Sequence, residues 1–384
     1  MTPGRRAVLA AVSVNLVAVF PLFLTGAMAV QIGRGLGVKP TSIAILASLF
    51  ALATVTGSAP LGARVGSWGV RRSLRISSVC AAIALLLIAV SPSVIVLGLA
   101  LVVGGLANAL GQPAGNSLVA AQVSPQRYGL GFAIKQSGIP LATLLGGLAV
   151  PIVALTVGWR TAFAIAAVAA LVAMTLVPAD RMRVAGRSES PVPRPLLAPL
   201  WMLAIGTSAA VFAATSIGAL GAAGGVAVGL SEGAAGYLVA LGGLAGLAVR
   251  LAAGVAADRR RFDALRGVAT LCLLGALGWS AMATGSAVAF SIGLVIANAF
   301  GWGWPGLQHL AIARRFPTST AAASGISQTG VAFGLLLGPA TLGVIATTLS
   351  WSWTWGAAAG AALLGAAAVL WSATRIPREA PATR

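Results

Sequence analysis

The stretch "IKQSG" at residues 134–138 recurs as "ISQTG" at residues 326–330, with Ile, Gln and Gly in matching places. The same offset of 192 residues relates other distinctive residues of the chain. These pairs are Gly62 with Gly254, Cys80 with Cys272, Pro113 with Pro305, Asn116 with Gln308 and Trp159 with Trp351. A register shared by several separate segments predicts that the chain is built from two similar halves, because chance matches would not keep one offset.

Both halves consist of long apolar runs. Of the 384 residues, 58% are hydrophobic and 8% are charged, which is too apolar for a soluble domain. A helix needs about 20 apolar residues to cross a bilayer. We expect twelve such helices, at residues 7–30, 41–62, 73–90, 94–119, 129–153, 160–177, 197–220, 232–254, 266–286, 288–312, 320–346 and 351–373. The predicted fold is therefore an all-α membrane protein with twelve transmembrane helices in two six-helix bundles.

The polar, basic and proline-containing stretch "ADRMRVAGRSESPVPRPL" (179–196) separates the bundles. It predicts an N-terminal bundle at 1–178, a cytoplasmic linker at 179–196 and a C-terminal bundle at 197–384. Six spans per half is an even number, so both halves enter the membrane from the same side. We therefore expect a pseudo-twofold axis along the membrane normal, with the functional site where the halves meet.

The basic residues predict the orientation. Of 25 Lys and Arg residues, 20 fall in the termini and in the loops on the same side as the termini. Three fall on the other side and two within spans. By the positive-inside rule, this bias predicts a multi-pass protein of the cytoplasmic membrane with both termini cytoplasmic. The net charge of +19 is spread over short clusters rather than one patch, so we expect no nucleic-acid partner.

Two loops and one helix entry carry a family resemblance. The loop "GARVGSWGVRR" (62–72) is similar to the motif G-x-x-x-D-R-x-G-R-R of the major facilitator superfamily, and "GVAADRRR" (254–261) is its counterpart in the second half. The segment "GWRTAF" (158–163) resembles the family's entry into the sixth span. The chain thus resembles that superfamily over essentially its whole length. The resemblance implies alternating access, with spans 1, 4, 7 and 10 around a central cavity and spans 5 and 8 between the halves.

The loop motif also suggests gating residues. Its acid should fall at position 66, where the chain has Gly66, whereas the second half keeps Asp258. The resemblance implies that Asp258 contacts the start of the fifth span, where a helix N-terminus favours an anion. The predicted gating set is Gly62, Arg71, Arg72, Arg250, Gly254, Asp258 and Arg259. As alternatives, the loop arginines only set the topology, and Arg250 extends its head group to the membrane surface instead of bracing the gate.

Lys135 is a charged residue about 9 Å into the fifth span, at 1.5 Å per residue. In one interpretation, the side chain of Lys135 extends along the helix so that its ammonium group reaches the membrane surface. Residues three or four apart share a helix face, however, and Lys135 shares its face with Gly131 and Gly138. Small residues mark helix packing rather than lipid contact. We therefore expect Lys135 to point inward, and a cation there favours an anionic substrate.

Amides and other polar residues occupy the same layer of the predicted bundle. Asn108, Gln112 and Asn116 are spaced by four and form one stripe, while Gln136 and Gln328 are repeat-related and could face each other. The predicted substrate-binding set is Asn15, Asn108, Gln112, Asn116, Lys135, Gln136, Trp302, Gln308, His309 and Gln328. Trp302 would supply a flat apolar wall, and His309 could carry a proton. The alternative for the amides is hydrogen bonding within the helix core, and for His309 simple packing.

No acid falls at mid-membrane, and no spacing typical of a metal site or catalytic motif occurs, so we expect no enzyme, cofactor or metal. The favoured function is a secondary transporter of a small organic anion, acting as a monomer in the lipid bilayer. The alternative is a multidrug or metabolite efflux antiporter, although the Gly-Pro-x-x-Gly-Gly element of drug antiporters is missing from the fifth span. A channel or an intramembrane enzyme is the alternative from another class.

Overall fold

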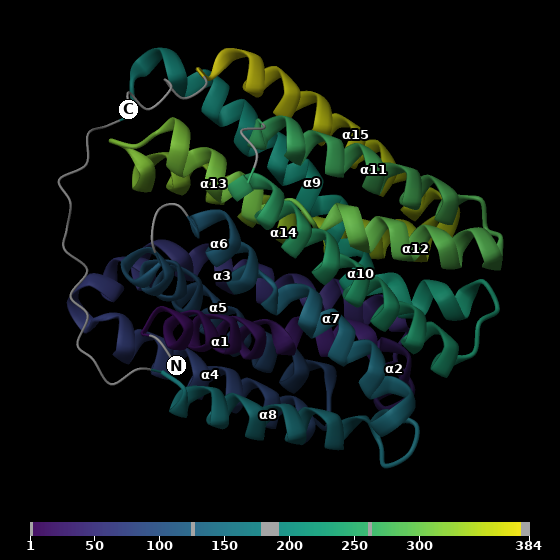
Figure 1. The fold of residues 1–384 in the computed structure, drawn as a ribbon. Coiled ribbons are helices and arrows are strands. Elements are labelled where there is room, and N and C mark those ends of the chain that lie inside the picture. Colours follow the sequence, from purple (N-terminus) through teal and green to yellow (C-terminus); the bar gives the residue numbers. More distant parts are fainter. Residues whose placement is uncertain (1–2, 124–126, 178–191, 260–262, 378–384) are drawn as a thin grey trace.

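The computed structural model describes residues 3–123, 127–177, 192–259 and 263–377, and these residues form a bundle of long helices (Figure 1). The helices before the predicted linker are α1 (Pro3–Ala27), α2 (Ala29–Leu36), α3 (Pro40–Trp68), α4 (Val70–Ala89), α5 (Val94–Gln122), α6 (Tyr128–Gln136), α7 (Gly138–Ala149), the π-helix η2 (Val150–Ala154) and α8 (Trp159–Thr175). The helices after it are α9 (Arg194–Ala227), α10 (Glu232–Arg259), α11 (Ala264–Ala283), α12 (Ala287–Gly301), α13 (Pro305–Arg315), α14 (Thr320–Thr348) and α15 (Trp351–Arg375).

The described residues confirm the all-helical membrane fold. Eleven segments are long and apolar enough to cross a membrane, and the sixth expected span, α8, is a shorter apolar helix. Large apolar side chains cover the outside, with Ile95, Val288 and Leu364 each about 70% exposed. Such a surface requires an apolar solvent. Most of the predicted linker lies outside the described residues, so the exact domain boundaries stay a prediction.

Three predicted spans are broken by local sequence. The first span ends at Ala27, and the short α2 follows it until Gly37, whose φ of 68° ends the helix. The fifth span divides into α6 and α7 near Pro140, and the tenth divides into α12 and α13 just before Pro305. Proline lacks the N–H that a continuous helix needs, which accounts for the last two breaks.

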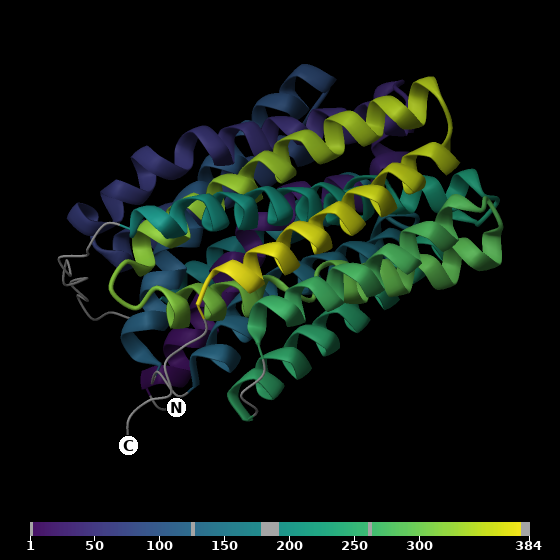
Figure 2. The same ribbon diagram turned by 90° about the horizontal axis from the view of Figure 1, so that it is seen from above.

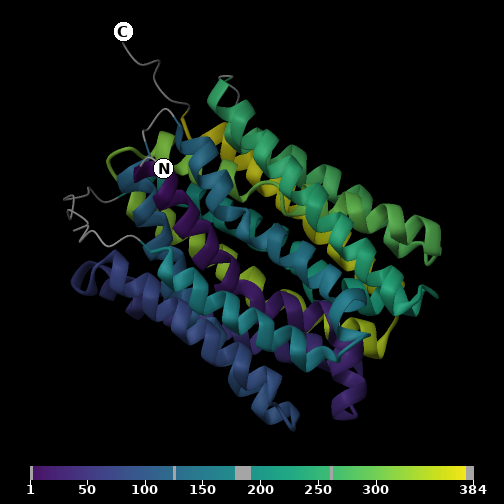
Figure 3. The same cartoon turned by 60° about the horizontal axis from the view of Figure 1, so that its bottom comes forward.

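The two halves pack against each other along several helix pairs. α3 contacts α14, α7 contacts α10, and α1 contacts α9. Figures 1 and 2 show the start of α1 and the end of α15 at the same end of the bundle, which we call the terminal end, and α2 lies at the opposite, distal end. Figure 3 shows the long helices running side by side between these two ends.

Small residues allow this close packing. On α14, a Cβ atom added to Gly330, Gly334 or Gly338 would lie within 2.2 Å of a backbone oxygen or side chain of α9. Between the halves, a Cβ on Gly26 of α1 would lie 1.7 Å from the carbonyl oxygen of Gly218 of α9. Helices in a membrane associate largely through such van der Waals contact, which explains the many glycines in the spans.

Candidate functional site

Lys135 lies on α6 and is fully buried within the bundle. Its Nζ donates a hydrogen bond to Oε1 of Gln112 on α5. The amide of Gln112 donates in turn to Oδ1 of Asn15 on α1, at 2.6 Å, and to Oδ1 of Asn108, at 3.3 Å. The Asn15 amide donates to the backbone oxygen of Lys135, at 2.9 Å. The inward orientation is therefore confirmed, and the alternative that Lys135 reaches the membrane surface is wrong.

Glycines make room for this cluster. A Cβ on Gly115 would lie 3.2 Å from Cε of Lys135, and a Cβ on Gly138 would lie 2.7 Å from Nδ2 of Asn15. Asn116 is half-buried one turn beyond Gln112, and its Oδ1 has no hydrogen-bond partner among the described residues. The predicted stripe on α5 is real, and two of its members, Asn108 and Gln112, are joined directly.

In the C-terminal half, the polar residues of α13 face α14. The amide of Gln308 donates to Oγ of Ser327. His309 has Nδ1 2.7 Å from the backbone oxygen of Pro305 and Nε2 3.1 Å from the amide of Gln328. These partners fit the neutral ring in which Nδ1–H donates to the carbonyl and Nε2 accepts from the amide.

His309 also reaches the other half. Its ring stacks on that of Phe132 on α6, with centroids 5.9 Å apart and planes 17° apart. Phe132 precedes Lys135 by three residues and shares its helix face. The expectation that Gln136 and Gln328 face each other is not supported. Gln136 is buried, whereas Gln328 is exposed and bonds to His309.

Arg250 on α10 is buried, with 1% of its surface exposed. Its guanidinium donates to the backbone oxygens of Gln136, in the N-terminal half, and Trp302, in its own half. The alternative that Arg250 extends to the membrane surface is therefore wrong. Trp302 is also packed rather than open to a ligand: its Nε1 donates to the oxygen of Ala214 at 2.9 Å, and its ring meets Phe23 edge-on.

The described residues place no carboxylate in ion-pairing contact with Lys135 or Arg250. The ion pairs found among these residues join Arg34 to Glu232, and Arg266 and Arg315 to Asp263. The same part of the chain contains no group of three metal-ligating side chains. The centre of the bundle thus holds two buried cations whose visible partners are amides and carbonyl oxygens.

The predicted gate contact of Asp258 is present. Its carboxylate accepts hydrogen bonds from the backbone N–H groups of Gly129, at 3.1 Å, and Leu130, at 2.9 Å, in the first turn of α6. Gly254, one turn earlier on α10, packs closely on the same segment, since a Cβ there would lie 2.6 Å from that of Ala133. One carboxylate thus joins the two halves at the terminal end.

Among the described residues, the two glycines of the corresponding loop in the first half, Gly62 and Gly66, make no such contact. Gly62 packs on Pro113 within its own half, and a Cβ on Gly66 would meet no atom within 4 Å. The exposed Arg72 lies over the ring of Trp68, 5.9 Å from its centroid. Arg71 is half-buried on the same helix, and the side chain of Arg259 lies outside the described residues.

The comparisons with known proteins agree with this geometry. The family model of the Major Facilitator Superfamily matches residues 11–313. The chain belongs to the major facilitator superfamily. Among solved structures, it is similar to the crystal structure of the nucleoside transporter NupG (D323A mutant), with a TM-score of 0.72 and 13% identity, covering 97% of this chain and 100% of that one. No curated protein matches the chain in sequence. The protein is therefore a membrane transporter and not an enzyme.

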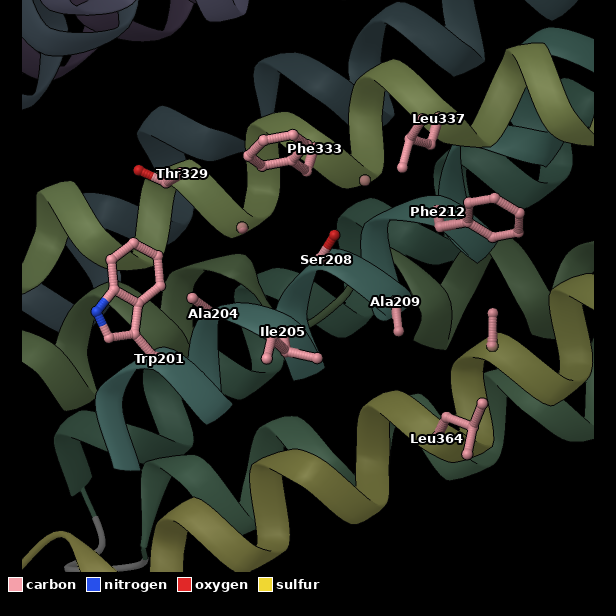
Figure 4. Close-up of a pocket in the computed structure, with 13 residues that line it drawn as sticks. Trp201, Ala204, Ile205, Ser208, Ala209, Phe212, Thr329, Phe333, Leu337 and Leu364 are labelled. Atoms are coloured by element: carbon pink, nitrogen blue, oxygen red, sulfur yellow. The ribbon is translucent and has the colours of Figure 1, made fainter. Parts of the chain in front are cut away.

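A groove on the outside of this superfamily member is distinct from the polar centre. It encloses about 570 Å³ between α9, α14 and α15, and Figure 4 shows Trp201, Ile205, Phe333 and Leu364 around it. Its lining carries no charged residue, and most of its large side chains, Trp201, Ile205, Phe333, Leu337 and Leu364, are exposed at the bundle surface. This composition suits contact with lipid acyl chains rather than a polar solute.

Sequence reasoning missed a contact between the halves of this transporter at the distal end. Glu232, at the start of α10, accepts hydrogen bonds from Gln31, at 2.7 Å, and from Arg34, both on α2. The only signal was an acid at one helix start and a basic residue after the first span. Because α2 was not predicted as a helix, nothing placed these residues together.

Proposed function

We propose that the protein carries a small organic anion across the cytoplasmic membrane by alternating access. The observation that supports this is Lys135, a fully buried cation whose hydrogen-bond partner is the neutral Gln112. A buried charge without a counter-charge is costly, and membrane proteins keep such groups where a substrate or ion passes. An anion would supply the missing negative charge.

The residues around Lys135 suit a carboxylate. Its ammonium group offers further donors, and Asn116, one turn from Gln112 on α5, is only half-buried, so its side chain can reach a ligand. On the other side, Gln308 and His309 of α13 could bind a second polar group of the solute. In this proposal Lys135 provides the charge, and the amides select the shape.

The electrostatic attraction between Lys135 and an anionic solute is large enough to make the proposal testable. Two unit charges 4 Å apart attract by about 4 kcal/mol at an effective dielectric constant of 20. Since 1.4 kcal/mol corresponds to a tenfold change in affinity, losing even a third of this attraction weakens binding about tenfold. Neutralising Lys135 should thus have a large effect on an anion and little effect on a neutral solute.

The positions of the charges support the orientation. The terminal end carries most of the described basic residues outside the core, among them Arg64, Arg72, Arg127, Arg315 and Arg375. The distal end carries Arg34, Lys39 and Arg160. We propose that the terminal end is cytoplasmic. We further propose that the transporter acts as a monomer, because each chain holds both halves of the site.

Two opposing sets of contacts support alternating access. Asp258 joins the halves at the terminal end, and Glu232 joins them at the distal end. In the proposed cycle, one set opens while the other holds. The halves then rock about the central layer that contains Lys135.

The test is a thermal-shift and uptake assay on the purified protein. The probes are the sodium salts of benzoate, succinate and citrate, with uridine as a neutral solute and tetraphenylphosphonium as an organic cation. A ligand at 100 times its dissociation constant stabilises the folded protein by about 2.7 kcal/mol, which a melting curve detects. The best anion is then followed into proteoliposomes as a radiolabelled compound.

The chain offers a matched control, because Lys39 is its only other lysine and lies exposed at the distal end. We expect Lys135→Gln to abolish the shift and the uptake of the anion, and Lys39→Gln to leave both unchanged. Equal anion uptake by both variants would contradict the proposal. Stabilisation by tetraphenylphosphonium alone would favour the efflux alternative, and stabilisation by uridine alone would favour a neutral solute.

A further inference from the structure

Two buried carbonyl groups near the centre of the bundle lack their usual helical donors. The carbonyl of Gln136 would normally bond to the N–H four residues later, but that residue is Pro140. The carbonyl of Trp302 lies in the turn between the end of α12 at Gly301 and the start of α13, where the regular helical bonds are interrupted and Pro305, three residues later, has no N–H to offer. An unsatisfied buried carbonyl costs about 1 to 3 kcal/mol.

Arg250 satisfies both of these carbonyls with one side chain. Its Nη1 donates to Gln136 and its Nη2 donates to Trp302. The guanidinium is a planar, rigid fork, which suits two acceptors at a fixed separation better than the point charge of a lysine. The side chain is 1% exposed, so water does not compete for these bonds.

The two helix breaks carry the residues of the proposed site. Lys135 lies directly before the break of the fifth span, in the N-terminal half. Gln308 and His309 lie in the first turns after the break of the tenth span, in the C-terminal half. Whatever fixes one break to the other therefore fixes the two sides of the site relative to each other.

We propose that Arg250 is a positioning residue that ties the helix break at Gln136 to the helix break at Trp302 and so sets the spacing of the two halves around the site. This inference rests on the proposed transport function. Its test uses no substrate, so a wrong substrate class and a wrong role for Arg250 give different results. In the cycle, the bond to Gln136 is the one that crosses between the halves and has to break or follow the movement.

The experiment measures the distance between the halves by electron paramagnetic resonance. Spin labels are attached to cysteines at Ala63 on α3 and Ala322 on α14, both exposed and in different halves, after replacement of the two native cysteines. Melting temperatures of the same proteins are measured in detergent. The matched control is Arg160→Gln, because Arg160 donates to the oxygen of Ser91 at 2.8 Å within one half.

We expect Arg250→Gln to broaden the distance distribution and add a population with a different separation, and Arg160→Gln to leave the distribution unchanged. Arg250→Lys should resemble Arg250→Gln, since one ammonium group cannot replace the fork. An unchanged distribution in folded Arg250→Gln would overturn the proposal.

A second variant separates positioning from simple carbonyl satisfaction. Pro140→Ala gives the chain back an N–H for the Gln136 carbonyl, so adding it to Arg250→Gln should recover melting temperature. It should not recover the narrow distance distribution, because the tie to Trp302 is still missing. Recovery of both would mean that Arg250 only satisfies a carbonyl, and would overturn the proposal. If Arg250→Gln alone does not fold, this double variant and Arg250→Lys provide the test.

Discussion

Asp258→Asn is the sharpest perturbation of the gate, because the structure gives the two hydrogen bonds that it weakens. The first four N–H groups of a helix have no partner within the helix. In α6, two of them, those of Gly129 and Leu130, donate to the Asp258 carboxylate at 3.1 and 2.9 Å. Their protection from solvent exchange therefore depends on a residue of the opposite half.

The magnitude follows from the charge of the acceptor. Hydrogen bonds to a charged group contribute about 1.5 to 3 kcal/mol each, and an anion at a helix N-terminus adds about 0.3 to 1 kcal/mol. The asparagine side chain of the variant would keep one neutral acceptor and place an NH₂ group against the other N–H. We estimate a loss of about 2 to 4 kcal/mol, which shifts the opening equilibrium roughly 30- to 900-fold.

Hydrogen-exchange mass spectrometry of the peptide that contains Gly129 and Leu130 measures this shift. We expect both amides to exchange at least about 30-fold faster in Asp258→Asn. The matched control is Asp263→Asn. Asp263 caps α11 within the C-terminal half by accepting from the Leu265 amide at 3.1 Å, so it should not affect α6. If the exchange of Gly129 and Leu130 stays the same in Asp258→Asn, the carboxylate does not hold the terminal end together.

Three further perturbations test other parts of the structure. Gly147→Val should keep the distal end from closing, because a Cβ there would lie 2.4 Å from a backbone nitrogen of α10. The accessibility of a cysteine introduced at the distal end should therefore rise. The control Gly360→Val should leave this accessibility unchanged, because a Cβ at Gly360 meets no atom within 4 Å. Trp279→Phe removes the buried hydrogen bond from Nε1 of Trp279 to Oγ of Ser216, at 3.1 Å, and should lower the free energy of unfolding by about 1 kcal/mol. Thermal melting measures this loss, and the control Trp353→Phe, at a side chain 68% exposed, should not show it. Glu232→Gln should weaken the distal contact by no more than about 1 kcal/mol because its arginine partner is largely exposed, so a large loss of transport in proteoliposomes would contradict this estimate.

Several features were readable from the sequence because they depend on local composition. The spans follow from runs of apolar residues, and the inward direction of Lys135 follows from the glycines on its helix face. The contact of Asp258 with the start of the fifth span came only from the family resemblance of its loop motif, because it joins residues that are far apart in the sequence. The stripe of amides on α5 follows from a spacing of four. For the spans, the direction of Lys135 and the amide stripe, residues near in sequence carried the whole signal.

Other predictions went wrong where contacts join distant residues. The alternative in which Arg250 reaches the membrane surface was wrong, because its guanidinium bonds to the carbonyl of Gln136, 114 residues away in the sequence. Trp302 was expected to line the site but is packed against α1 and α9. Gln328 was expected opposite Gln136 and instead pairs with His309. Nothing in the order of residues states which of many apolar surfaces a given helix face will meet.

The sequence by itself determined which segments are long and apolar enough to cross the membrane, and that Lys135 points into the bundle, while the relation between the two halves stays a prediction. Hydrophobic run length and helical periodicity are properties of a single segment, and a bilayer solvent acts on each segment separately. Only the tertiary structure decided which partners the buried Lys135 and Arg250 obtain. Those partners come from other helices, and helix packing, rather than hydrophobicity, brings their carbonyls and amides within bonding distance.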